Sequence, residues 1–363
     1  MRRPFPRRRL VAVATVLATT LALAACGSSS SSTSSASSAS GSGSSSGSSS
    51  SSSSSGGSSG GGTIGFSIPQ GSNPALQALD AGLQAEAQKE GFQVRTTDAN
   101  LDPNKQISDL QAFIQQHVKA LVVWPLDDHA VQPAYAQAAA AHIPIITIYT
   151  LVNGPYYTDL LLDGTGVGNN AAHWFAQNIG PHANVAAILG PPQVDQFLQI
   201  AQGWQAGVKE TGINQLASQV DPKLAPDDAV NITSDYKTRY GSKLQGLFVT
   251  LESQAIALSA VVNGSFKPKI TTYGGTDACL NALKSGLVSV CYYQNPTLMG
   301  RIAGWAAGQA IAGKSIPKQL HLTMPTITQA NVGSYPNAKA QLTAPYTFKP
   351  VMQNGQWTMP GFK

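Results

Sequence analysis

Two cysteines in the C-terminal half of the chain, Cys279 and Cys291, have the residue type and spacing most suggestive of chemistry. Cys279 falls in the first turn of a predicted helix that begins near Asp277, and Cys291 lies toward the end of the strand that returns from it. A helix and the strand after it run antiparallel, so the two α-carbons can come within the roughly 4.4 to 6.8 Å that a disulfide requires. The sequence therefore predicts a Cys279–Cys291 disulfide if the chain reaches an oxidising compartment, and two buried thiols are the alternative.

The remaining reactive residue types form no catalytic or metal-binding set. The 6 histidines are scattered without the spacing of metal ligands. The glycine-rich segment 164–168 precedes a helix but lacks the lysine of a phosphate-binding loop. Adjacent carboxylates such as Asp127 and Asp128 are typical of exposed loops. We therefore expect a binding protein and not an enzyme, with no cofactor and no metal.

The N-terminus has the pattern of an export signal. Five arginines precede an apolar run, residues 10–22, that is too short to span a bilayer comfortably. The segment Leu23-Ala24-Ala25-Cys26-Gly27 follows and resembles the bacterial lipobox, in which the cysteine is acylated. This resemblance implies a signal peptide over residues 1–25 and a lipid-anchored Cys26 on the extracytoplasmic face of the cell membrane. The alternative is an ordinary secretory signal cut after Ala25, which leaves Cys26 as a free thiol.

Composition separates a tether from a folded body. Residues 27–62 are almost wholly serine and glycine, which cannot bury apolar area, so residues 26–62 are predicted to be a flexible linker that begins at the lipidated cysteine. The formal charge of +5 equals the number of arginines in the signal peptide, so the mature chain is electrically balanced. A balanced chain without a basic block gives no indication of nucleic-acid binding.

From residue 63 onward, apolar β-prone runs alternate with helical periodicity. The first series contains a strand at 63–68, a helix started by Asn73-Pro74, and a buried apolar run at Ala120–Trp124. The alternation stops near 158–163 and then resumes. The second series has predicted helices at 166–179, 195–210, 253–263 and 277–285, and predicted strands at 185–189, 246–250, 269–274 and 287–292. Strict alternation predicts two doubly wound parallel-sheet α/β units, which bind ligands outside the carboxyl ends of their strands.

Several short motifs in this order resemble the type 1 periplasmic binding proteins, the ribose- and galactose-binding family. The motifs that show this resemblance are Ile64-Gly65-Phe66-Ser67, Asn73-Pro74, Lys105–Leu110, Val122–Asp127, Ile143–Ile146, Gly274–Asp277, Gln294-Asn295-Pro296 and Met299-Gly300. The family topology implies three crossings between lobes, near Asp163, Gln294 and His321. It assigns residues 63–163 plus 295–320 to an N-terminal lobe, and 164–294 plus 321–363 to a C-terminal lobe and tail. The crossings would form a three-strand hinge on which the lobes close over a ligand.

The resemblance also implies which residues face the cleft. These are Asn73, Trp124, Tyr149, Phe197, Glu252, Asp277 and Gln294. Asn73 and Asp277 also sit at helix starts, where a capping role is the alternative. Gln294 lies at a crossover, and its alternative role is to hydrogen-bond backbone groups of the hinge. The alternative for Trp124 is a place in the hydrophobic core.

One departure from the family pattern affects the ligand. Sugar-binding members carry an Asp-Arg pair and a further Arg at places that here hold Tyr149-Thr150 and Leu198 or Ile200. Without those guanidinium groups, ligand identity does not carry over. With Glu252 and Asp277 as its acids, the pocket suits a neutral polyol or sugar-like compound, an aromatic or nucleoside-like compound, or a cation, and fits an anion poorly.

We expect a solute-binding protein that acts as a monomer and delivers a small polar ligand to the permease of an ABC importer. The alternative is a membrane-tethered sensor that presents the ligand to a receptor. A regulator on the same fold is disfavoured because the export signal directs the chain out of the cytoplasm.

Overall fold

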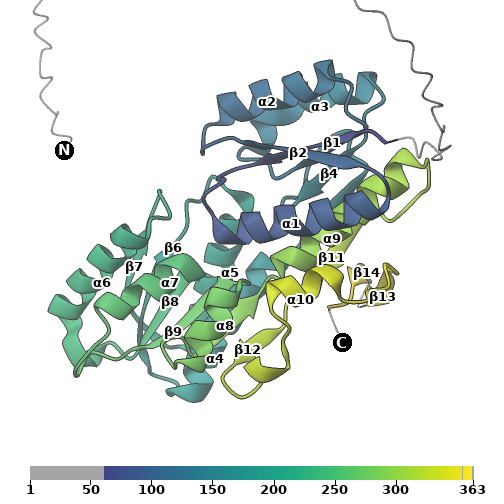
Figure 1. Cartoon of the computed structure of the whole chain (residues 1–363). Coiled ribbons are helices and arrows are strands. Elements are labelled where there is room, and N and C mark those ends of the chain that lie inside the picture. Colours follow the sequence, from purple (N-terminus) through teal and green to yellow (C-terminus); the bar gives the residue numbers. More distant parts are fainter. Residues whose placement is uncertain (1–60, 354, 362–363) are drawn as a thin grey trace, which may run out of the picture. The chain divides into compact units, whose positions relative to one another are not determined.

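The computed structural model describes residues 61–353 and 355–361, so the predicted signal peptide, Cys26 and nearly all of the tether lie outside the described residues. The described chain forms one eight-stranded and one six-stranded sheet, each with its own helices (Figure 1). We call the part built on the eight-stranded sheet the first lobe and the part built on the six-stranded sheet the second lobe. No helix among the described residues is long and apolar enough to cross a membrane.

The first-lobe sheet has the strand order β13-β14-β11-β5-β4-β3-β1-β2. All of its neighbouring strands are parallel except β13, which pairs antiparallel with β14 at one edge. The strands are β1 (Thr63–Ile68), β2 (Gln93–Asp98), β3 (Ala120–Val123), β4 (Ile145–Ile148), β5 (Thr158–Leu161), β11 (Gln319–Leu322), β13 (Val351–Gln353) and β14 (Gln356–Met359).

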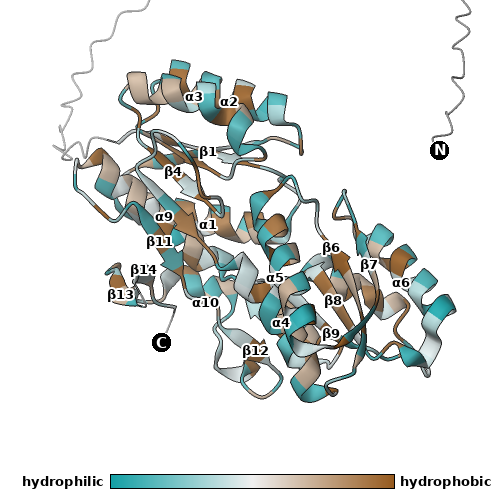
Figure 2. Ribbon diagram, turned by 180° about the vertical axis from the view of Figure 1, so that it is seen from behind, coloured by the Kyte–Doolittle hydropathy of each residue, from teal (hydrophilic) through white to brown (hydrophobic). Residues whose placement is uncertain are grey.

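The second-lobe sheet has the order β12-β10-β9-β8-β6-β7 and is parallel except for the edge strand β12. Strands β6 and β8 consist largely of apolar residues (Figure 2), as expected for a sheet that is covered on both faces. The strands are β6 (Asn184–Leu189), β7 (Asn214–Val220), β8 (Gly246–Leu251), β9 (Lys269–Gly274), β10 (Val290–Tyr293) and β12 (Thr326–Thr328).

The helices alternate with these strands along the chain. Several begin at a side-chain cap: Asn73, Asp102 and Asp127 each accept a hydrogen bond from a backbone N–H in the first turn of the helix that follows. The helices are α1 (Pro74–Lys89), α2 (Pro103–Gln115), α3 (Asp128–Ala140), α4 (Gly164–Asn178), α5 (Asp195–Thr211), α6 (Pro226–Tyr240), α7 (Glu252–Ala257), α8 (Asp277–Lys284), α9 (Pro296–Ile311) and α10 (Ala338–Thr343). The prediction of two doubly wound α/β lobes is confirmed.

Each lobe contains one helix pair that packs at very short range. Helices α1 and α9 lie side by side in the first lobe (Figure 1), and α4 packs against α5 in the second. A Cβ added at Gly300 of α9 would lie 1.9 Å from the Leu79 carbonyl oxygen of α1, and one at Gly203 of α5 would lie 1.9 Å from the Thr165 carbonyl oxygen of α4. No side chain fits at either position, so these glycines set the spacing of the helices on each sheet.

The described chain passes between the lobes four times, and the first three passages lie near Asp163, Gln294 and His321. Strand β5 leads to α4, β10 leads to α9, and β11 leads to β12. The structure differs in the tail, which the sequence assigned to the second lobe. After β12 the chain returns, and β14 joins the first-lobe sheet beside β11, with His321 opposite Thr358. The last strands are three and four residues long, too short to give a readable sequence pattern.

The second-lobe elements β7 and α6, which are consecutive in the chain, were missing from the sequence prediction. Strand β7 lies at the edge of the sheet and has mostly half-buried or exposed residues, so it lacks the apolar run of the central strands. Helix α6 contains β-branched and aromatic residues that weaken the helical signal.

The predicted disulfide is present in the structure. Cys279 in the first turn of α8 is bonded to Cys291 of β10, and the α-carbons are 6.6 Å apart. Both residues are fully buried. The bond therefore joins a helix of the second lobe to the strand that returns from it.

Candidate ligand-binding site

A cavity of about 270 Å³ lies between residues of the two lobes. Its first-lobe wall comes from the segments that follow β1, β2 and β3, including Asn73 and Trp124. Its second-lobe wall comes from the segments that follow β6 and β7, including Gln193 and Phe197. These segments are all at the carboxyl ends of parallel strands, where open α/β sheets bind ligands.

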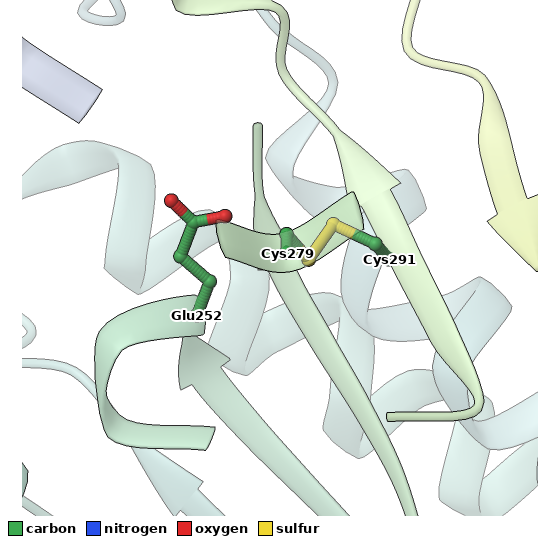
Figure 3. A group of neighbouring side chains, drawn as sticks. All are labelled: Glu252, Cys279 and Cys291. Atoms are coloured by element: carbon green, nitrogen blue, oxygen red, sulfur yellow. A yellow bond between two sulfur atoms is a disulfide. The ribbon is translucent and has the colours of Figure 1, made fainter. Parts of the chain in front are cut away.

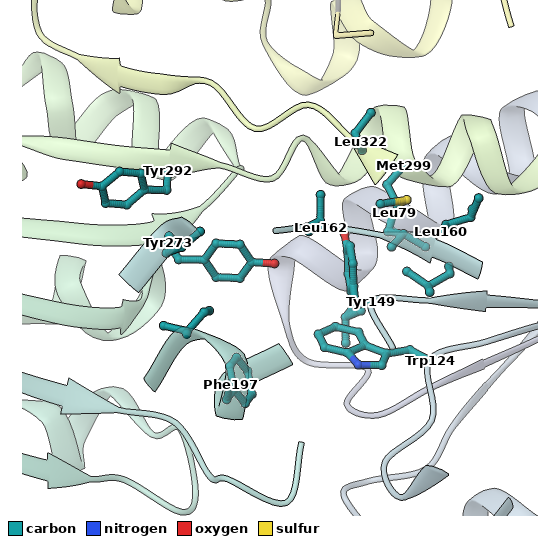
Figure 4. Close-up of a cluster of buried hydrophobic side chains, with 14 of the residues drawn as sticks. Leu79, Trp124, Tyr149, Leu160, Leu162, Phe197, Tyr273, Tyr292, Met299 and Leu322 are labelled. Atoms are coloured by element: carbon teal, nitrogen blue, oxygen red, sulfur yellow. The ribbon is translucent and has the colours of Figure 1, made fainter. Parts of the chain in front are cut away.

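Trp124 is the aromatic residue of the first-lobe wall, and Tyr149 packs against it. Their ring centroids are 4.7 Å apart and the planes meet at 84°, an edge-to-face contact (Figure 4). Tyr149 has a φ of 64°, in the left-handed region that non-glycine residues seldom adopt. Its main-chain N–H donates to the Leu160 carbonyl at 2.8 Å, which ties the strained residue to β5. The main chain of Tyr149 is thus hydrogen-bonded to β5 at the point where its ring packs on Trp124.

Two buried polar atoms of this pair have no partner among the described residues: Nε1 of Trp124 and the hydroxyl of Tyr149. Burial raises the pKa of the Tyr149 hydroxyl, so it remains protonated. Buried donors without a partner are uncommon and need an explanation. In Figure 4 the indole nitrogen lies on the edge of Trp124 turned away from Tyr149.

Asn73 and Phe197 contribute from opposite lobes. Asn73 Oδ1 accepts the Ala75 N–H at 2.9 Å, so the residue is both a helix cap and part of the cavity wall. Phe197 is buried on α5 and packs against Gly190, where an added Cβ would lie 2.7 Å from the ring. The glycine after β6 therefore allows the phenylalanine to reach its position.

Gln294 is buried at the second crossing and does not line the cavity. Its Oε1 accepts the Tyr273 hydroxyl at 2.8 Å, and its main-chain N–H donates to the Gly274 carbonyl at 2.8 Å. Burial raises the pKa of Tyr273, whose hydroxyl therefore acts as a donor. The residue thus connects β9 to the hinge segment.

Glu252 is a buried carboxylate at the start of α7. Its Oε2 accepts the N–H groups of Gly275 at 2.9 Å and Thr276 at 3.1 Å, while burial raises the pKa of the carboxyl group. The carboxylate lies beside the disulfide (Figure 3), and its oxygen is within 4.8 Å of the sulfurs of Cys279 and Cys291. Because the two sulfurs are bonded to each other, this group offers no thiolates to a metal ion.

Asp277 is directed to the tail and not to the cavity. Its Oδ1 accepts the N–H of Ala338, the first residue of α10, at 2.8 Å. A local sequence pattern cannot distinguish a carboxylate that binds a ligand from one that caps a distant helix, since both stand at a helix start.

The structure thus brings Asn73, Trp124 and Phe197 together at one cavity, with Tyr149 behind Trp124. Glu252, Asp277 and Gln294 have other hydrogen-bond partners. Sequence analysis missed Gln70 and Gln193, which also line the cavity. Their position just after strands β1 and β6 is the sequence feature that could have identified them.

Comparisons with known proteins identify a matching protein family and similar proteins within it. A family model described as periplasmic binding protein domain matches residues 64–315. The ribose import binding protein RbsB of Bacillus subtilis is 28% identical over 271 residues, which cover 74% of this chain and 87% of that protein.

Two solved structures support the same fold. The ABC transporter periplasmic solute binding protein from Actinobacillus succinogenes with bound D-allose has a TM-score of 0.69 and 22% identity, and covers 76% of this chain and 100% of its own. The ABC transporter solute binding protein from Mycobacterium smegmatis with bound glycerol has a TM-score of 0.69 and 24% identity, and covers 76% of this chain and 96% of its own.

Proposed function

The chain belongs to the periplasmic binding protein family, and from that premise we propose that it captures a small uncharged polar ligand between its lobes and delivers it to an ABC importer. The resemblance found in the sequence is thereby confirmed. The relatives are solute-binding proteins, so the chain is a binding protein and not an enzyme. A sugar or sugar-like compound is one candidate within this class of uncharged polar ligands.

The observation that carries this proposal is the cavity with walls from both lobes at the carboxyl ends of their strands. A ligand there touches both lobes at once, so its binding favours the closed arrangement over the open one. The segments that pass between the lobes are where such a motion would bend.

We propose Asn73, Trp124 and Phe197 as direct ligand contacts and Tyr149 as the residue that positions Trp124. Glu252, Asp277 and Gln294 form a second proposed set, which would reach a ligand only by exchanging the hydrogen bonds described above.

The location and anchor are also part of the proposal. Cys26 lies outside the described residues, and its lipobox-like context supports acylation and attachment to the extracytoplasmic face of the membrane. A Cys26→Ser variant should leave the membrane fraction, and unchanged retention would contradict acylation. We further propose that the exported protein is a monomer that docks on the importer permease.

The test is mass spectrometry of small molecules that remain bound to the protein after purification without denaturation. Trp124→Ala and Asn73→Ala should carry less of the compound than the parent protein, whereas the exposed control Asn281→Ala should carry the same amount. A compound retained equally by all four proteins would refute binding in this cavity.

A further inference from the structure

The side chains that line the cavity are mostly apolar. Eleven of its fourteen residues are proline, leucine, valine, phenylalanine or tryptophan, and the other three are the amides Gln70, Asn73 and Gln193. None of the fourteen has a charged side chain. A ligand therefore meets apolar surface over most of the wall and hydrogen-bonding groups at a few points.

The absence of charge in this lining excludes an ionic ligand. Removing an ion from water without a counter-charge costs several kcal/mol. The acids expected from the sequence do not help, because neither Glu252 nor Asp277 lines the cavity and both accept main-chain N–H groups elsewhere. A cation therefore has no carboxylate here, and an anion has no guanidinium.

The number of polar groups also limits the ligand. A free sugar carries a hydroxyl on nearly every carbon, and each hydroxyl buried without a partner costs about 1 to 3 kcal/mol. One of the three amide oxygens is already engaged, since Asn73 Oδ1 accepts the Ala75 N–H at 2.9 Å. The remaining groups can satisfy a ligand with one or two polar substituents more readily than a ring fully substituted with hydroxyls.

Aromatic side chains enter the cavity from both lobes, Trp124 from the first and Phe197 from the second. Trp124 is 8% exposed, and its Nε1–H is buried without a partner among the described residues. An indole N–H is a donor only, so it requires an acceptor such as an oxygen atom. A flat apolar ring with an oxygen substituent provides both the stacking surface and the acceptor.

We propose that the ligand is a small uncharged ring compound with one or two polar groups, such as an aromatic alcohol, and not a free sugar. This inference rests on the proposed function, because it concerns the ligand of the same cleft. A cavity of about 270 Å³ is below the size range of drug-sized ligands and suits a single ring.

The test is calorimetric titration of the exported protein, stripped of bound compounds, with three probes. These are 4-hydroxybenzyl alcohol, its charged analogue 4-hydroxybenzoate, and D-ribose. We expect the alcohol to bind at least tenfold more tightly than either of the others. Trp124→Phe keeps an aromatic wall but removes the N–H, so it should weaken binding of the alcohol by roughly three- to tenfold. The control Trp357→Phe, on an exposed tail residue, should not change it.

Each other outcome overturns the inference. Tighter binding of D-ribose would refute the ligand class while leaving the proposed capture function in place. Equal binding of the alcohol and 4-hydroxybenzoate would refute the charge argument. Binding of the alcohol that is unaffected by Trp124→Phe would place it outside this cavity. Failure of all three probes would also reject the class, and the compound retained on purification would then test the capture function separately.

Discussion

The Gln341 side chain donates a hydrogen bond to the Tyr293 hydroxyl at 2.9 Å, which joins the C-terminal tail to strand β10 of the second lobe. The carbonyl of the same residue accepts from Arg301 Nη1 at 2.8 Å, and Arg301 belongs to α9 of the first lobe. Gln341 is 1% exposed. The tail therefore makes hydrogen bonds to both lobes through one buried residue.

Removing the Tyr293 hydroxyl should loosen this contact. Tyr293→Phe deletes the acceptor but leaves Gln341 Nε2 its second bond, to the Pro336 carbonyl at 2.8 Å, so the loss of unfolding free energy should be about 1 kcal/mol. Gln341→Ala removes both bonds and should cost more. Hydrogen exchange of residues 338–344 should speed up in both variants and stay unchanged in Lys339→Ala, an exposed control on α10. Equal exchange in all three would contradict the contact.

The buried ion pair between Arg301 and Glu86 should be important for stability. Arg301 Nε lies 3.1 Å from Glu86 Oε2, and Nη1 also donates to the Ala344 carbonyl at 2.8 Å. Arg301→Met leaves two carbonyls without this donor and leaves Glu86 Oε2 with only Lys89 Nζ at 2.8 Å, so unfolding free energy should fall by about 2 to 4 kcal/mol in urea titration. The exposed Arg239–Asp235 pair is the control, and Arg239→Met should change stability by less than about 1 kcal/mol. Similar losses in both variants would argue against the buried pair.

Asp159 should make stability depend on pH. Burial raises the pKa of this carboxyl group to about 6 from 3.8, although Thr147 Oγ1 donates a hydrogen bond to it. The folded state therefore holds the proton more tightly than the unfolded state, and unfolding free energy from this group falls as pH rises from about 4 to about 6. Asp159→Asn should remove that decrease and be the more stable protein at pH 7. Thermal unfolding at several pH values tests this, with Asp227→Asn as an exposed control; a pH profile that is the same in Asp159→Asn and the parent would count against it.

Removing the Cys279–Cys291 bond should destabilise the second lobe. The bond closes a short loop, and the chain-entropy model gives about 3 kcal/mol for a loop of this size. The double variant Cys279→Ser and Cys291→Ser should unfold at lower urea concentration than the parent protein, and dithiothreitol should affect only the parent. Recovery of both cysteines as free thiols from exported protein would refute the bond.

Much of this architecture follows from the sequence alone because its signals are local. Alternating β-prone and helical periodicity predicts two α/β lobes, and Asn73-Pro74 marks the start of a helix. The disulfide was also predictable, because a helix and the strand that returns from it are adjacent in the chain and antiparallel in space.

The tertiary structure alone decided which groups meet across long sequence separations. Strand β14 pairs with β11 through two residue pairs, Asp277 caps α10 in the tail, and Gln341 lies between Arg301 and Tyr293. None of these contacts has a local pattern, because each partner looks the same in sequence whether it faces a ligand, solvent or the tail. Packing of the two sheets and the returning tail fixes those choices, and it leaves Trp124 and Phe197 at the cavity while Asp277 is turned away from it.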